Sequence, residues 1–171
     1  MPVDDTTLNQ NGVVLRLWHP DDAEWYVHAR DEQVFRWTTE RRELTVQETA
    51  HAIQQINDDA NVFAFAIAHN QSNELLGSIA IVRDQTKPQS AEVMYWLAPQ
   101  GRGRGVATQA LQIIVAWAFN TLNVDQILLQ THVDNIPSQR VAERVGFRQM
   151  EHQNDNSEGG EKVWFVLTHA M

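Results

Sequence analysis

A glycine- and arginine-rich segment between two apolar runs constrains the fold of this chain more than any other feature. The segment reads Gln-Gly-Arg-Gly-Arg-Gly over residues 100–105; it follows the β-rich run 91–97 and precedes the apolar run 106–119, whose spacing is helical. Glycines let backbone N–H groups approach phosphate oxygens, and a helix start adds unpaired N–H groups and the positive end of the helix dipole. The sequence therefore predicts an anion site at a strand–turn–helix junction.

The spacing of the glycines separates the candidate ligands. A P-loop requires a Lys-Ser or Lys-Thr pair after the glycines, and no such pair follows here. A Rossmann fingerprint requires a glycine in sixth place, where Val106 stands when the count starts at Gly101. The segment fits the pattern Gln-x-x-Gly-x-Gly, with Gln100, Gly103 and Gly105. The alternative interpretation is a glycine-rich turn that merely starts a helix.

Composition predicts one folded domain over residues 1–171. An apolar content of 43% and six tryptophans suit a packed core. The chain has no cysteine, which excludes disulfides, thiolate catalysis and cysteine-bound zinc, and its histidines form no metal-binding pair of the His-Glu-x-x-His type. The formal net charge of −9 argues against broad binding of nucleic acid or anionic membranes. There is no apolar run suited to a signal peptide or a bilayer span, so we expect a cytoplasmic location.

The hydrophobic pattern predicts the element order β-α-α-β-β-β-α-β-α-β-β. The predicted strands are 13–18, 62–68, 75–83, 91–97, 125–133, 147–151 and 162–168, and the predicted helices are 20–30, 45–57, 106–119 and 138–145. Residues 32–44 lack clear periodicity and are expected to form a loop, and 154–160 a polar turn. This order indicates a single mixed sheet with helices on its faces, which is an α+β fold or α/β sandwich.

Three local signals predict where elements begin, bend or end. Thr45 and Glu48 have the spacing of a capping box at a helix start. Gly146 is expected to end the last helix in the left-handed conformation. Gly77, inside a predicted strand, is expected to mark a bulge or a close backbone approach.

The element order and the glycine loop together resemble the GNAT acyl-CoA N-acyltransferases. Two more segments resemble the RimJ/RimL-like branch of that family: residues 91–99, Ala-Glu-Val-Met-Tyr-Trp-Leu-Ala-Pro, and residues 134–147, which contain Asn-x-x-Ser-x-Arg. The resemblance covers nearly the whole chain. It implies a mixed, mostly antiparallel central sheet flanked by helices. Two residues depart from the pattern, Val106 after the last loop glycine and Trp164 in the last strand.

The resemblance further implies an N-acetyltransferase that moves an acetyl group from acetyl-CoA to a primary amine by direct attack on the thioester. The strand 91–97 would part from the strand 125–133, and the pantetheine arm would fill the wedge. A backbone N–H near Met94 or Tyr95 would contact the carbonyl oxygen. The residues expected to hold acetyl-CoA are Met94, Trp96 and Leu97 along the strand, through their backbone groups, Arg102, Gly103, Arg104, Gly105, Val106 and Ala107 at the pyrophosphate, and Asn135 at the thiol end.

Two side chains are expected to handle protons. Ser138 is the candidate to protonate the leaving thiolate, and Glu92 is the candidate base, for which it would need a raised pKa. Each has an alternative role: Ser138, like Asn135, can bond backbone groups at a helix start, and Glu92 can be a solvated edge carboxylate. His132 is a second candidate for relaying a proton; the alternative is a histidine with no chemical role. Trp37 is expected either to line the acceptor pocket or to pack in the core.

Three functions compete at this stage. The first is the N-acetyltransferase, with acetyl-CoA as co-substrate, an amine acceptor such as a protein N-terminus or a small amine, and no metal. The second is a non-catalytic acyl-CoA-binding or sensor domain, which would lose the proton-handling groups. The third, an RNA-binding module, conflicts with the acidic balance of the chain. We expect no nucleic-acid or membrane partner and either a monomer or a homodimer.

Overall fold

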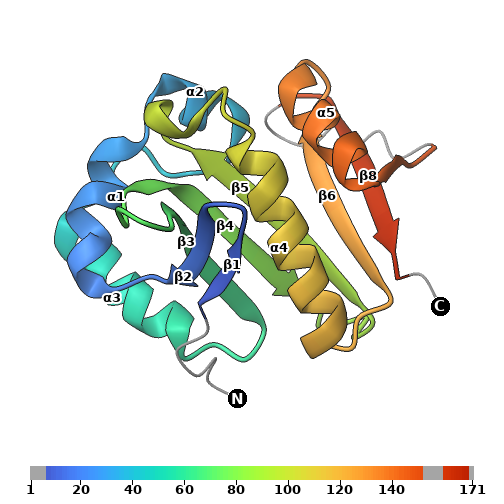
Figure 1. Cartoon of the computed structure of the whole chain (residues 1–171), viewed down its shortest axis with the longest axis horizontal. Coiled ribbons are helices and arrows are strands. Elements are labelled where there is room, and N and C mark those ends of the chain that lie inside the picture. Colours follow the sequence, from blue (N-terminus) through green and yellow to red (C-terminus); the bar gives the residue numbers. More distant parts are fainter. Residues whose placement is uncertain (1–6, 152–159, 170–171) are drawn as a thin grey trace.

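One mixed sheet with helices on both faces makes up the computed structural model, which describes residues 7–151 and 160–169 (Figure 1). The sheet order is β1 (Leu8–Gln10), β2 (Val13–Leu17), β3 (Val62–His69), β4 (Leu75–Arg83), β5 (Ser90–Leu97), β6 (Gln126–His132), β8 (Lys162–Thr168) and β7 (Arg148–Gln149). Among these strands only β5 and β6 pair in parallel. The predicted fold class, a mostly antiparallel sheet flanked by helices, is confirmed.

The two faces of the sheet carry different helices. The helices are α1 (Ala23–Ala29), α2 (Glu32–Trp37), α3 (Val46–Asn57), α4 (Val106–Thr121) and α5 (Ile136–Val145), with short 3-10 turns at Pro20–Asp22 and Pro99–Gly101. The α4 helix crosses one face (Figure 1), where Leu111 and Ile114 join Ile79 in the main core. On the other face, Ile53 of α3 packs with Ala66 of β3 in a second cluster. Side chains alternate between faces along a strand, so neighbouring residues of β5 reach opposite layers.

Three elements differ from the prediction. Residues 32–44, predicted to be a loop, contain the helix α2, which spans only six residues and is too short to show helical periodicity. The strand β1 was not predicted, although Asn11 and Gly12 carry the Asn-Gly signal of a tight hairpin. Both residues have the positive φ that such a turn needs, 53° and 88°. The last predicted hairpin strand, 147–151, is shorter than expected, and most of the predicted turn at 154–160 lies outside the described residues.

The predicted local signals are confirmed. Thr45 Oγ1 accepts from the Glu48 N–H at 3.1 Å, and the Glu48 carboxylate accepts from the Thr45 N–H at 2.9 Å, which completes the capping box. Gly146 ends α5 with a φ of 104°. At Gly77, a Cβ atom would overlap the carbonyl oxygen of Trp96, and the register with β3 shifts nearby. In the described part of the chain, no helix combines the length and apolar character needed to cross a membrane.

Candidate active site

The strands β5 and β6 diverge halfway along their length. Their parallel pairing ends at Val93 and Leu129, whereas β5 continues to Leu97 and β6 to His132. Figure 1 shows the sheet opening between these strands, near the start of α4 and beside α5. The predicted parting of these two strands is therefore present.

Backbone groups on the open edge of β5 have no strand partner. The Ala98 N–H donates to a carbonyl of β4, and successive residues of a strand direct their backbone groups to opposite sides. Tyr95 and Leu97 therefore direct their N–H and C=O groups into the gap, while those of Met94 and Trp96 face β4. The backbone contacts expected from Met94 and Trp96 are therefore not available to a ligand in the gap, because these groups face β4, whereas those of Leu97 are. The Leu97 carbonyl oxygen also accepts a bond from Arg102 at 2.8 Å.

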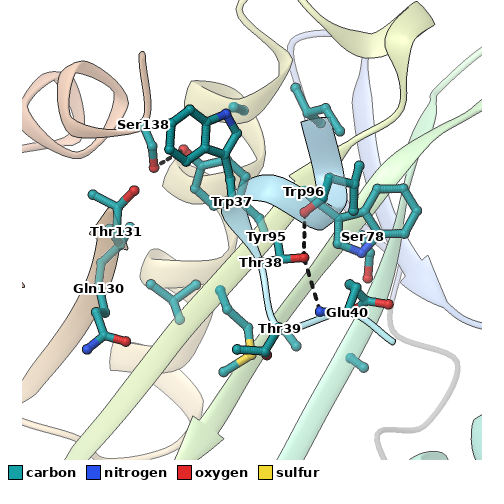
Figure 2. Close-up of a pocket in the computed structure, with 18 of the residues that line it drawn as sticks. Trp37, Thr38, Thr39, Glu40, Ser78, Tyr95, Trp96, Gln130, Thr131 and Ser138 are labelled. Atoms are coloured by element: carbon teal, nitrogen blue, oxygen red, sulfur yellow. Dashed lines mark hydrogen bonds between the residues drawn. The ribbon is translucent and has the colours of Figure 1, made fainter. Parts of the chain in front are cut away.

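A cavity of about 1180 Å³ extends from the start of α4 along this gap to α2 and α3. Every predicted site residue except Arg104 lines it. Figure 2 shows Trp37, Thr38, Thr39 and Glu40 on one side of the cavity and Gln130, Thr131 and Ser138 on another. The tertiary structure thus brings together residues that lie far apart in the chain.

The glycine loop at one end of the cavity has the geometry of an anion site. Gly103 and Gly105 have φ values of 71° and 75°, and a Cβ atom added to either would meet nothing within 4 Å. Gly105 is the N-cap of α4 and offers no capping side chain, so the first N–H groups of the helix, from Val106 onward, have no intrahelical partner. These donors, with the helix dipole, suit a phosphate group.

The two arginines of the loop have different surroundings. Arg102 donates from Nη1 and Nη2 to the two carboxylate oxygens of Asp31, at 2.8 Å each. Arg104 is exposed. The sequence pattern treats the two arginines alike, because nothing in the spacing indicates Asp31, which is 71 residues away from Arg102.

Ser138 bonds the side chain of Tyr95, for which the sequence motifs had predicted no chemical role. Its Oγ lies 3.0 Å from the hydroxyl oxygen of Tyr95 (Figure 2). Burial raises the pKa of Tyr95, and the hydrogen bond to Ser138 acts in the opposite direction. Asn135 caps α5, because its Oδ1 accepts from the Ser138 N–H at 3.4 Å. The Ser138 hydroxyl is thus directed to Tyr95, while Asn135 serves the helix start.

Glu92 and the Tyr95–Ser138 pair lie on opposite faces of the sheet. Along β5, Glu92 and Tyr95 are three residues apart and therefore project to opposite sides, with Tyr95 meeting α5. Glu92 stands at the closed end of the gap, one residue before the last pairing with β6. It is half-buried, and burial raises its pKa, while the positive charge of Lys162 partly offsets that rise. A base and an acid placed this way would act on a group in the gap from two sides.

Aromatic and polar contacts shape the other end of the cavity. The Trp37 and His132 rings lie 5.3 Å apart between centroids, which joins α2 to β6 across the gap. The buried Arg30 donates to Glu40 at 3.1 Å and to a backbone carbonyl of the same loop, and the Tyr26 hydroxyl donates to Glu40 at 2.8 Å. This network holds the loop after α2. It could not be predicted from the sequence, because the partners of Glu40 are 14 and 10 residues away and form no recognisable motif with it.

Residues 7–151 and 160–169, which the structure describes, contain no cluster of three or more histidine, aspartate or glutamate side chains that could hold a metal ion. The polar groups that line the cavity include backbone N–H groups, hydroxyls and carboxylates. Such a set suits binding and proton transfer on an organic substrate.

Comparison with known proteins finds a matching family and similar sequences. Residues 13–148 match the family described as Acetyltransferase (GNAT) domain. The ribosomal-protein-serine acetyltransferase of Escherichia coli (strain K12) is 32% identical over 91 residues, which cover 50% of this chain and 51% of that protein.

Two solved structures share the fold. RimJ of Mycobacterium smegmatis in complex with CoA-disulfide superposes with a TM-score of 0.82 at 21% identity, covering 95% of this chain and 86% of that one. Spermidine N-acetyltransferase from Vibrio cholerae, in complex with CoA and spermine, gives 0.81 at 18% identity, covering 93% and 96%. At these identities the likeness shows the fold alone, whereas the match to the family model confirms the resemblance to the GNAT family stated from the sequence motifs.

Proposed function

The chain belongs to the GNAT acetyltransferase family, and on that premise we propose that it transfers the acetyl group of acetyl-CoA to a primary amine by direct attack on the thioester. Family membership makes it an N-acetyltransferase, so the expectation of an enzyme is confirmed. The observation that carries the finer proposal is the gap between β5 and β6, whose unpaired edge at Tyr95 and Leu97 meets the start of α4. We also propose that residues 1–171 form one domain.

The cavity fits an extended thioester ligand with a phosphate group at one end. The free N–H groups after Gly105 and the bare surface over Gly103 suit the pyrophosphate, with the exposed Arg104 adding charge. The open backbone edge of β5 suits the amide groups of the pantetheine arm, which would pair as a short strand. The Tyr95 N–H is then placed to donate to the thioester carbonyl oxygen as negative charge develops there.

The chemistry needs one proton acceptor and one proton donor. As the amine nitrogen bonds to the carbonyl carbon and the carbon–sulfur bond breaks, Glu92 takes the amine proton, directly or through water. Ser138 gives its proton to the sulfur, and its hydrogen bond to Tyr95 provides a route to replace that proton. No covalent enzyme intermediate is required, which agrees with the absence of cysteine.

The acceptor amine belongs to one of two classes represented among the similar proteins. One relative is named for serine of a ribosomal protein, and one fold neighbour holds spermine. We propose a protein N-terminus or a small amine for this chain. The test is a panel of N-terminal peptides, polyamines and amino acids incubated with acetyl-CoA, with release of free thiol and mass-spectrometric detection of acetylated product. Binding of acetyl-CoA without acetylation of any amine would contradict the proposal.

Ser138→Ala is expected to lower turnover while leaving acetyl-CoA affinity unchanged, because a proton donor acts on the leaving thiolate and not on the bound ground state. General acid catalysis is worth ~10²–10⁴-fold, and substitution by water places the effect at the low end of this range. The measurement is kcat from thiol release, with acetyl-CoA Kd from calorimetry. Tyr95→Phe keeps the ring and tests the second hydroxyl. A wild-type kcat in Ser138→Ala would show that Ser138 is not the proton donor and serves only the start of α5.

Lys162→Met is expected to move the acid limb of the kcat/KM profile to higher pH. The positive charge of Lys162 lowers the pKa of Glu92, so its removal raises that pKa further. Glu92 must be ionised to accept a proton, and a higher pKa leaves less carboxylate at a given pH. Lys87→Met, on an exposed loop outside the cavity, is the control. A limb that stays in place or moves to lower pH would show that Glu92 does not govern it.

A further inference from the structure

The guanidinium group of Arg102 is already bonded to protein atoms within the glycine loop. Besides its two bonds to Asp31, it donates to the Leu97 carbonyl oxygen, and its side chain is only 27% exposed. Arg104, two residues later, has an exposed position and no hydrogen-bond partner among the described residues. The two arginines therefore differ in how far they are available to a ligand.

Asp31 links this loop to the beginning of α2. It is the N-cap of that helix, and its Oδ1 accepts from the Val34 N–H at 3.1 Å. Hydrogen bonding to Arg102 lowers the pKa of Asp31 to about 2, so the carboxylate is ionised near neutral pH. One carboxylate thus starts α2 and joins it to the residue between two loop glycines.

The other end of α2 reaches the far part of the cavity. Trp37, its last residue, lines the cavity and lies against His132, and the Arg36 guanidinium carbon is 4.5 Å from the centroid of the Trp37 ring. Six residues of α-helix span about 9 Å at about 1.5 Å per residue. In the middle, Val34 packs against Trp96 in a small buried cluster. A helix this short moves as a unit, so its position at Asp31 affects the position of Trp37.

We propose that Arg102 is a positioning residue for the acceptor amine. Its ion pair with Asp31 holds α2 in place so that Trp37 forms a wall of the acceptor side of the cavity, whereas Arg104 and the loop backbone serve the pyrophosphate. This inference rests on the proposed function, because it assumes that the α2 side of the cavity receives the amine. The segment that binds one substrate then also shapes the pocket of the other.

Asp31→Ser removes the ion pair with Arg102 but keeps a capping side chain at the start of α2. Serine caps a helix about as well as aspartate but cannot pair with a guanidinium, and Arg102 stays in the chain, free to bind phosphate. We expect the KM of the amine identified in the acceptor panel to rise about five- to tenfold, since a partly buried charge-assisted pair is lost. The acetyl-CoA Kd and kcat should stay within about twofold of wild type. Arg104→Ala, the matched control, should weaken acetyl-CoA binding and leave the amine KM unchanged.

A second measurement does not need the acceptor. Hydrogen exchange of the amides of residues 32–38, in the protein without ligands, should be about five- to tenfold faster in Asp31→Ser and in Arg102→Ala than in Arg104→Ala or wild type, as the opening of α2 becomes easier. An unchanged Tm would show that each variant keeps the fold. Hydrogen exchange reports on the ion pair whether or not the proposed function is correct. A failure of the proposed function would be seen separately, as wild-type protein that binds no acetyl-CoA in calorimetry.

The opposite pattern would overturn the proposal. If Asp31→Ser keeps the wild-type amine KM and wild-type exchange of α2, and Arg102→Ala weakens acetyl-CoA as much as Arg104→Ala does, then Arg102 is a phosphate contact. If exchange accelerates but the amine KM does not change, the ion pair serves α2 alone and the positioning role is wrong.

Discussion

Gly103→Glu is expected to abolish binding of acetyl-CoA in a protein that still folds. The residue has a φ of 71° and nothing within 4 Å of an added Cβ, so a side chain there enters the open space over the start of α4. The glutamate would also place a negative charge where the pyrophosphate is proposed to bind. Like charges in direct contact cost several kcal/mol, so we expect affinity to fall about a hundredfold or more. Calorimetric titration with acetyl-CoA measures the effect.

Gly12→Glu is the matched control for this substitution. Gly12 also has a positive φ, 88°, and equally open surroundings, but it lies in the β1–β2 turn and does not line the cavity. The backbone strain of a side chain at positive φ is therefore similar in both variants. Equal loss of affinity in the two would trace the effect to strain, and wild-type affinity in folded Gly103→Glu would exclude the loop as the pyrophosphate site.

Glu92→Gln is expected to lower kcat/KM for the amine by ~10²–10⁴-fold, the usual range for loss of a general base, and to shift the rate profile to higher pH. A lysine-like amine has a pKa near ~10.4 and an α-amine near ~7.7–8.0, so the acceptor is mostly protonated at neutral pH. Burial raises the pKa of Glu92, which makes its carboxylate a stronger base. Without it, the enzyme must wait for neutral amine from solution. Acetyl-CoA Kd should not change.

Glu24→Gln removes the same charge from an exposed position on α1 outside the cavity and controls for net charge. It should keep the wild-type rate and profile. If Glu92→Gln behaves in the same way, Glu92 is not the base, and the amine proton leaves through water or through His132.

Features encoded in short stretches were predictable from sequence. The capping box of Thr45 and Glu48, the left-handed Gly146 and the irregularity at Gly77 each depend on neighbours in the chain or on the absence of a Cβ atom. The long helix α4 shows helical periodicity because it buries one face along many residues, and the central strands stand out as short apolar runs because helices cover both faces of the sheet. The helix α2 was not predicted, because six residues are too few to show helical periodicity. It is stabilised by the Asp31 cap and by the packing of Val34.

The sequence by itself determined the sheet, its main helices and the glycine loop, since these follow from local pattern and from where glycine alone is tolerated. Only the tertiary structure decided that Arg102 pairs with Asp31 while Arg104 stays exposed, and that Ser138 meets Tyr95. The partners in these contacts are 71 and 43 residues apart. Side-chain pairing over such separations depends on how the elements pack, and the spacing of residues along the chain does not predict which side chains meet.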